Sequence, residues 1–277
     1  AWYGQYPAAD IRVYDEIGET GERMLPYYNY YVIWRGLYSV HGGSIDWTND
    51  ALGIISYSNE LWNGGQYFNS PLLQAQQRDP DSPISGQRSR FFFDDLLEFG
   101  DQYVEWAPFD HPVYGAVEMG GFKKLSGRVN PRFMSMELFH RNMAFTLYHA
   151  DMMPLMSIGE TTVERIEGDL FRVRVDITNE RLIPTITVKA TQNRVVRPDI
   201  ITVEGAEVVA AGWVPDKHRP GPTEMIEQAE LDRILVRSGA PGRHTRTLEY
   251  LVRGSGTMTV EYSSLKGGTV RTTVPLR

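Results

Sequence analysis

The stretch LFRVRVDIT, residues 170–178, decides the fold of the second half of the chain. Its residues alternate strictly between apolar and polar, so the apolar ones share one face of an extended strand. Similar runs follow, separated by Gly, Pro and Asn, at 185–190, 200–204, 233–237, 246–252, 257–262 and 269–274. Short antiparallel strands at this spacing predict a β-sandwich of about 120 residues. We expect this all-β domain to occupy residues 156–277.

The segment that precedes the sandwich has helical periodicity. Asn130-Pro131 is a typical helix start, an N-cap followed by proline, and Pro154 marks the end. The helix carries an apolar stripe at i, i+3 and i+4 spacing, which we expect to pack in the core, made of Phe133, Met136, Phe139, Met143 and Leu147. His140 and His149 lie on the same predicted helix, and we interpret both as core residues.

Nearer the N-terminus the pattern is mixed. Helical spacing predicts a helix over about 24–37, and the run that ends in GIISYSNEL predicts a short buried strand. Residues 63–90 are rich in Gly, Pro, Ser and Gln, which is typical of a surface excursion. RFFFDDLLEFGDQYV, residues 90–104, predicts a short helix that ends near Gly100.

Charge and aromatic residues divide the chain into two parts. Residues 1–150 hold 18 acidic and 11 basic side chains, the whole of the net charge of -7, and 28 of the 32 aromatic residues. This contrast predicts two domains, and the aromatic residues of the first would either line a binding cleft or build a large core, which composition alone favours. No basic stripe is present to bind nucleic acid, and no apolar run reaches the roughly 18 residues of a membrane span. The absence of cysteine excludes disulfides and thiol nucleophiles.

Few residues remain that could carry chemistry. None of the six histidines has a His or Glu three or four positions later, and no GxSxG or phosphate-binding loop occurs. Asp46 and Glu60 lie in a glycine-flanked segment. Glu60 falls within the predicted buried strand, where desolvation would raise its pKa. From the residues alone, a structural carboxylate and a catalytic one both stay open.

LYSVHGGSIDWTNDALGIISYSNELW, residues 37–62, resembles the end of the catalytic domain in zinc carboxypeptidases of the carboxypeptidase A type. In that family a mobile tyrosine precedes a Gly-Gly-Ser-Ile-Asp-Trp-like turn, and a glutamate follows the tryptophan by thirteen residues. Trp47 and Glu60 have the same spacing. More loosely, residues 121–154 resemble the closing helix of large bacterial members that carry a β-sandwich afterwards. The resemblance implies an α/β fold, with residues 1–155 as the C-terminal part of a mixed sheet flanked by helices.

The resemblance also implies roles for individual residues. Glu60 would deprotonate the zinc-bound water and pass the proton to the leaving amine, and Tyr38 would close over the bound peptide. Ile45 would form the floor of the pocket for the terminal side chain, with walls that include Val40, Gly43 and Ser58. An apolar floor favours apolar C-terminal residues of a peptide or protein substrate. Asp46 and Trp47 would be structural, the latter as a core side chain.

Several features depart from the family. His41 replaces a small residue, and residues 63–130 form a long insertion, a candidate lid. The HxxE zinc pair, the third ligand and the substrate-clamping arginines lie upstream of the tyrosine in the family, whereas residues 1–37 contain no histidine. The chain, which begins at Ala1, is therefore expected to hold no catalytic zinc and to be inactive by itself.

Three functional hypotheses follow. The first is the C-terminal portion of a secreted or periplasmic zinc carboxypeptidase whose single zinc ion is held elsewhere. The second is a non-catalytic peptide- or carbohydrate-binding protein that retains the cleft. The third is a glycoside-cleaving module that uses Asp46 and Glu60 as its carboxylate pair.

Overall fold

The computed structural model describes residues 6–26, 28–61, 81, 90–91, 93–126, 128–216 and 221–277. The chain divides into two compact units, which we name the sandwich unit (residues 1–17, 32–57 and 148–277) and the hairpin unit (residues 18–31 and 58–147). The described residues form a mixed α/β structure with few helices. Their three sheets pair antiparallel throughout.

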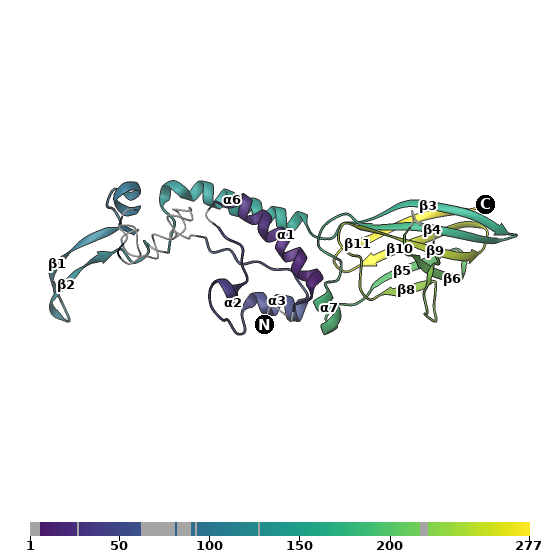
Figure 1. The fold of residues 1–277 in the computed structure, drawn as a ribbon, viewed down its shortest axis with the longest axis horizontal. Helices are drawn as coiled ribbons and strands as arrows, with labels where there is room; N and C mark the ends of the chain where they lie inside the picture. The colour runs from purple at the N-terminus through teal and green to yellow at the C-terminus, as the bar shows by residue number, and fades with distance from the viewer. Residues whose placement is uncertain are drawn as a thin grey trace. The chain divides into compact units, whose positions relative to one another are not determined.

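Two sheets face each other in the sandwich unit (Figure 1). The five-stranded sheet has the order β3-β4-β9-β6-β7 and the four-stranded sheet has the order β11-β10-β5-β8. The bounds are β3 Met156–Glu167, β4 Leu170–Asn179, β5 Asp199–Glu204, β6 Glu207–Val214, β7 Glu224–Met225, β8 Arg233–Val236, β9 His244–Arg253, β10 Gly256–Ser264 and β11 Gly268–Leu276. The predicted sandwich-like pair of sheets is thus confirmed.

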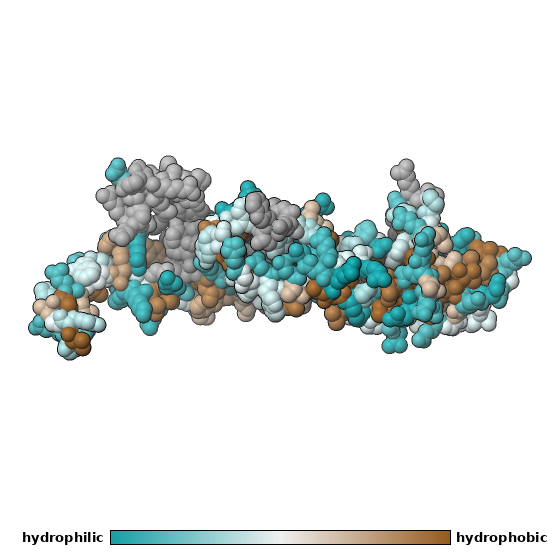
Figure 2. Space-filling model, turned by 90° about the horizontal axis from the view of Figure 1, so that it is seen from below, coloured by the Kyte–Doolittle hydropathy of each residue, from teal (hydrophilic) through white to brown (hydrophobic). Residues whose placement is uncertain are grey.

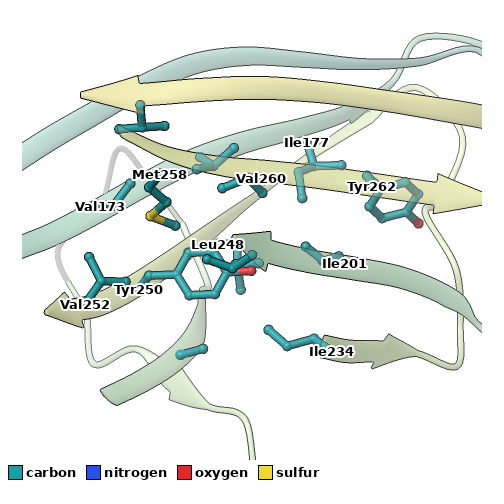
Figure 3. Packing of buried hydrophobic residues seen from close by; sticks show 14 of the residues in the cluster. Val173, Ile177, Ile201, Ile234, Leu248, Tyr250, Val252, Met258, Val260 and Tyr262 are labelled. Atoms are coloured by element: carbon teal, nitrogen blue, oxygen red, sulfur yellow. The ribbon is translucent and has the colours of Figure 1, made fainter. Parts of the chain in front are cut away.

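The alternation over residues 170–178 produces the buried face of β4. Phe171, Val173, Val175 and Ile177 are each at most 3% exposed. They pack against inward-facing residues of the opposite sheet, among them Ile201, Met258 and Val260 (Figure 3). Burial of each such side chain contributes about 1.5–3 kcal/mol. This shared core holds the two sheets together.

One predicted strand is wrong. Residues 185–190 contribute instead to a short helix, α7 (Val188–Asn193). The Thr187 side chain accepts a hydrogen bond from the Ala190 backbone amide, which caps the helix. The β-branched residues of this stretch mimic a strand pattern, but long-range contacts described below stabilise the helix.

The N-terminal segments form three helices, α1 (Ala8–Met24), α2 (Ile33–Gly36) and α3 (Ser44–Leu52). The predicted helix over 24–37 is therefore wrong. Pro26 explains the difference, because the residue before a proline disfavours helical backbone and α1 ends just upstream. The predicted strand around residues 54–61 is also wrong, since residues 53–60 have no regular secondary structure.

The hairpin unit contains a short π-helix, η3 (Asp94–Glu98), that ends at Phe99 in left-handed backbone. This agrees with the predicted helix end near Gly100. An antiparallel hairpin follows, formed by β1 (Tyr103–His111) and β2 (Gly115–Phe122), which the sequence did not predict. The predicted surface excursion over 63–90 lies outside the described residues, apart from residues 81 and 90.

Helix α6 (Arg132–Asp151) begins just after Asn130-Pro131, as predicted. Its apolar stripe, however, is not in the core. The helix buries Asn142 and Phe145, with Phe145 against Gly21 of α1. The opposite face is exposed by 50–83%, at Phe133, Met136, Phe139, Met143 and Leu147. Periodicity located an apolar face correctly but not the face that packs within this chain.

Candidate functional site

The segment that resembles the peptidases, residues 37–61, is built around α3. Gly43 is the N-cap residue of α3, and Asp46 lies in the first turn, where a carboxylate is stabilised by the helix dipole. Gly53 ends the helix in left-handed backbone at φ 60°. The chain then continues without regular secondary structure to residue 60.

The residues expected to bind substrate lie at the start of this segment. Tyr38 is 63% exposed, in the loop between α2 and α3, and its backbone amide donates to the Ile33 carbonyl. Val40, Gly43 and Ile45 are half-buried. All four belong to the sandwich unit.

Apolar and aromatic side chains near Tyr38 are exposed. Trp34 and Leu37 are each 44% exposed, and Trp47 is 59% exposed. The expectation that Trp47 is a core side chain is therefore wrong. His41 is exposed as well. The segment from α2 into α3 therefore carries several exposed apolar and aromatic side chains.

Ser58 and Glu60 belong to the hairpin unit, and both side chains are exposed. The expected burial of Glu60 in a strand is wrong. Of the apolar residues that suggested this strand, Ile55 is buried, whereas Ile54 and Leu61 are 41% and 54% exposed. Alternation alone cannot form a strand without a neighbouring strand to pair with.

Asn59, the residue before Glu60, is hydrogen-bonded to helix α6. Asn59 Nδ2 donates to Asn142 Oδ1 at 3.0 Å, and Asn142 Nδ2 donates to the Tyr28 hydroxyl at 3.2 Å. Burial raises the pKa of Tyr28, the hydrogen bond from Asn142 lowers it, and the nearby Glu60 charge raises it. Tyr28 and Asn142 are thus the polar groups that accompany the proposed catalytic carboxylate. Sequence reasoning missed both because their partners are distant in the chain.

A polar network around Tyr14 anchors the other side of α3. The Tyr14 hydroxyl accepts hydrogen bonds from Asn49 Nδ2 at 3.1 Å and from the Ser56 amide at 3.3 Å. The Tyr57 hydroxyl donates to the Tyr14 carbonyl at 2.5 Å. Burial raises the pKa of Tyr14 despite these bonds. The network ties residues 49–57 to α1.

The two histidines of α6 differ in burial. His149 is half-buried and its ring meets that of Tyr57 edge to face, with centroids 5.2 Å apart. Burial lowers the pKa of His149, which favours the neutral imidazole. His140 is exposed, so its expected core position is wrong.

The described residues do not fit a zinc ion. Among them, no group of three or more His, Asp or Glu side chains converges closely enough to hold a metal. Asp46 belongs to the sandwich unit and Glu60 to the hairpin unit.

A small, open pocket lies in the sandwich unit, and its lining includes Trp213, His244, Arg246 and Tyr262. The Arg246 guanidinium lies 3.7 Å from the centroid of the Trp213 ring. Burial lowers the pKa of Arg246. The stacked pair thus forms part of the wall of this pocket.

Comparison with family models gives a match to the second half of the chain. Residues 155–275 match the model of a family described as a domain of unknown function (DUF8731). The match spans the strands from β3 to β11. No curated protein matches the chain. No helix within the described ranges has both the length and the apolar character of a membrane span.

Proposed function

We propose that this chain is the C-terminal portion of a zinc-dependent metallocarboxypeptidase that releases apolar C-terminal residues from peptides. One observation carries the proposal: residues 37–62 contain the tyrosine, the Gly-Gly-Ser-Ile-Asp-Trp turn and the glutamate in the order and spacing of that family. Composition and fold class alone do not select this activity.

The arrangement of the substrate-binding residues supports the proposal. Tyr38 is exposed on a loop, so its side chain is free to swing toward a bound peptide. Ile45 and Val40 are half-buried and apolar, and they offer a hydrophobic surface to a terminal side chain. A pocket of this kind discriminates by burial of apolar area and rejects charged side chains.

The proposed role of Glu60 is proton transfer. An exposed carboxylate is accessible to water, which it deprotonates for attack on the peptide carbonyl before it passes the proton to the leaving amine. The zinc ion supplies a Lewis acid when it is bound. Under this proposal its ligands lie on a part of the protein that precedes Tyr38 in the chain order of the family, as the resemblance implies.

Exposed apolar surface gives independent support. The stripe on α6 and several side chains around Tyr38 are large, apolar or aromatic, and exposed to solvent. Figure 2 shows, in brown, that hydrophobic residues are present on the surface of the molecule. Soluble proteins rarely leave extended apolar surface uncovered. A larger catalytic domain would cover it.

The alternative is a non-catalytic protein that binds peptides or carbohydrates through the same surface. The exposed rings of Trp34, Tyr38 and Trp47 favour it, since aromatic side chains supply binding energy without catalytic groups.

A peptide panel separates the two. The longest protein encoded by the natural reading frame is loaded with zinc and incubated with peptides that end in Phe, Leu, Lys or Glu. The proposal expects release of Phe and Leu, detected by mass spectrometry. Binding of these peptides without release of any residue would support the alternative instead.

A further inference from the structure

The end of the β-sandwich that carries α7 presents hydrogen-bond donors to the last turn of α3. Lys266 Nζ donates to the Gly53 carbonyl at 2.8 Å, and Thr187 Oγ1 donates to the same oxygen at 3.1 Å. Asn193 Nδ2 donates to the Asp50 carbonyl at 2.9 Å. The last carbonyls of a helix have no partner within the helix. These three side chains therefore satisfy groups that the end of α3 leaves open.

Positive charge also gathers at this end of α3. Lys189 Nζ lies 3.2 Å from Asp50 Oδ1 in the last turn of the helix. Lys266 is half-buried, and burial lowers its pKa although the nearby Asp10 raises it. A helix C-terminus carries partial negative charge, so two ammonium groups stabilise it there. The charges of the sandwich and of the α3 end are complementary.

The packing of α7 against α3 requires glycine at the C-terminal end of α3. Gly53 has φ 60°, a conformation that side chains other than glycine rarely adopt. A Cβ at this position would lie 2.3 Å from Ala190 Cβ and 3.1 Å from Thr187 Oγ1. Helix α7 thus packs directly onto the backbone of Gly53, and α3 and α7 lie side by side (Figure 1).

We propose that Thr187, Lys189, Ala190, Asn193 and Lys266 form a receptor for the C-terminal end of a glycine-terminated helix, with α3 as its occupant. All five lie within residues 155–275, the region that matches the family model, so in this chain that region would hold α3. The domain holds α3 and thereby the loop that carries Tyr38. The inference concerns how α3 is held, and it stands whether or not the chain belongs to a peptidase.

Hydrogen exchange of the whole chain, followed by mass spectrometry, tests the receptor. Gly53→Ala introduces the clash with Ala190, and the matched control is Gly168→Ala. Gly168 has a similar φ of 56° in the β3–β4 turn, but a Cβ there meets no atom within 4 Å. We expect amides of residues 44–57 to exchange at least about tenfold faster in Gly53→Ala, because overpacking shifts the local opening equilibrium by that order. In Gly168→Ala these amides should exchange as in the wild type.

A second pair of variants does not depend on the glycine clash. Lys266→Met keeps the stem of the side chain and removes the ammonium, and Lys124→Met is the control at an exposed lysine. We expect faster exchange of residues 44–57 only in Lys266→Met. Adding Ala190→Gly to Gly53→Ala should restore part of the protection. Equal exchange of these amides in Lys266→Met and Lys124→Met would overturn the receptor, even if Gly53→Ala fails to fold.

Discussion

Replacement of Asp10 by alanine perturbs the contact between α1 and α7 at its most buried point. The Asp10 side chain is 1% exposed, and its two oxygens accept hydrogen bonds from the backbone amides of Val188 at 2.9 Å and Lys189 at 2.8 Å. In Asp10→Ala both amides lose their acceptor. Because no intrahelical partner exists for the first amides of a helix, only water can replace the carboxylate.

The structure gives the size of the effect. A hydrogen bond to a charged group contributes about 1.5–3 kcal/mol, and loss of a capping side chain costs about 0.5–2 kcal/mol. We expect Asp10→Ala to lower the free energy of unfolding of the sandwich unit by about 3 kcal/mol, near the low end for two charge-assisted bonds. For a unit of this size the midpoint temperature should fall by about 6–12 °C.

Urea unfolding followed by circular dichroism measures the change. The matched control is Glu19→Ala on the same helix, whose carboxylate makes only an exposed contact of 4.0 Å with Arg23. This control should cost at most about 0.5 kcal/mol. Asp10→Asn should lie between the two, because it retains one acceptor. If Asp10→Ala and Glu19→Ala unfold at the same urea concentration, the carboxylate does not hold α7.

Three further predictions concern other parts of the chain. Ile45→Asp in the zinc-loaded longer protein should favour peptides ending in Lys over peptides ending in Phe. We expect the ratio of kcat/KM for the Lys peptide to kcat/KM for the Phe peptide to rise by at least about tenfold. An unchanged ratio would show that Ile45 does not line the pocket. Phe139→Lys with Met143→Lys on the exposed stripe of α6 should change the free energy of unfolding of this chain by less than about 0.5 kcal/mol, measured by urea unfolding. A large loss of stability would show that the stripe is packed. Burial lowers the pKa of His149, so the stability that its neutral form contributes is present above its ordinary pKa of 6.5 and is lost as the pH falls below it. His149→Phe should therefore gain stability relative to the wild type as the pH falls from about 7.5 to 5, and a pH-independent difference would contradict this.

Local pattern predicted the sandwich but not the structures that depend on distant partners. The alternation in β4 was sufficient because β3 and β9 pair with its two edges and the opposite sheet buries its apolar face. Residues 185–190 have a similar pattern, yet the amides of α7 bond to Asp10, which lies 178 residues from Val188. The local periodicity of a sequence cannot predict a contact between residues so far apart in the chain.

In the candidate site, too, some features were predictable from the sequence and others were not. The resemblance in residues 37–62 identified Tyr38, Ile45 and Glu60, and their proposed roles remain predictions. The exposure of Glu60 was not predictable from its apolar run, since no strand among the described residues pairs with residues 53–60. The polar partners Asn142 and Tyr28 were missed because 114 residues separate them in the chain.

The most direct test of the proposed peptidase is the turnover of Glu60→Gln in the zinc-loaded longer protein, with Glu160→Gln, an exposed glutamate on β3, as control. Removal of a general base costs about 10²–10⁴-fold in kcat. We expect Glu60→Gln to lose release of C-terminal Phe by this factor with KM little changed, and Glu160→Gln to match the wild type. A Glu60→Gln variant whose kcat stays within a few-fold of the wild type would contradict the account.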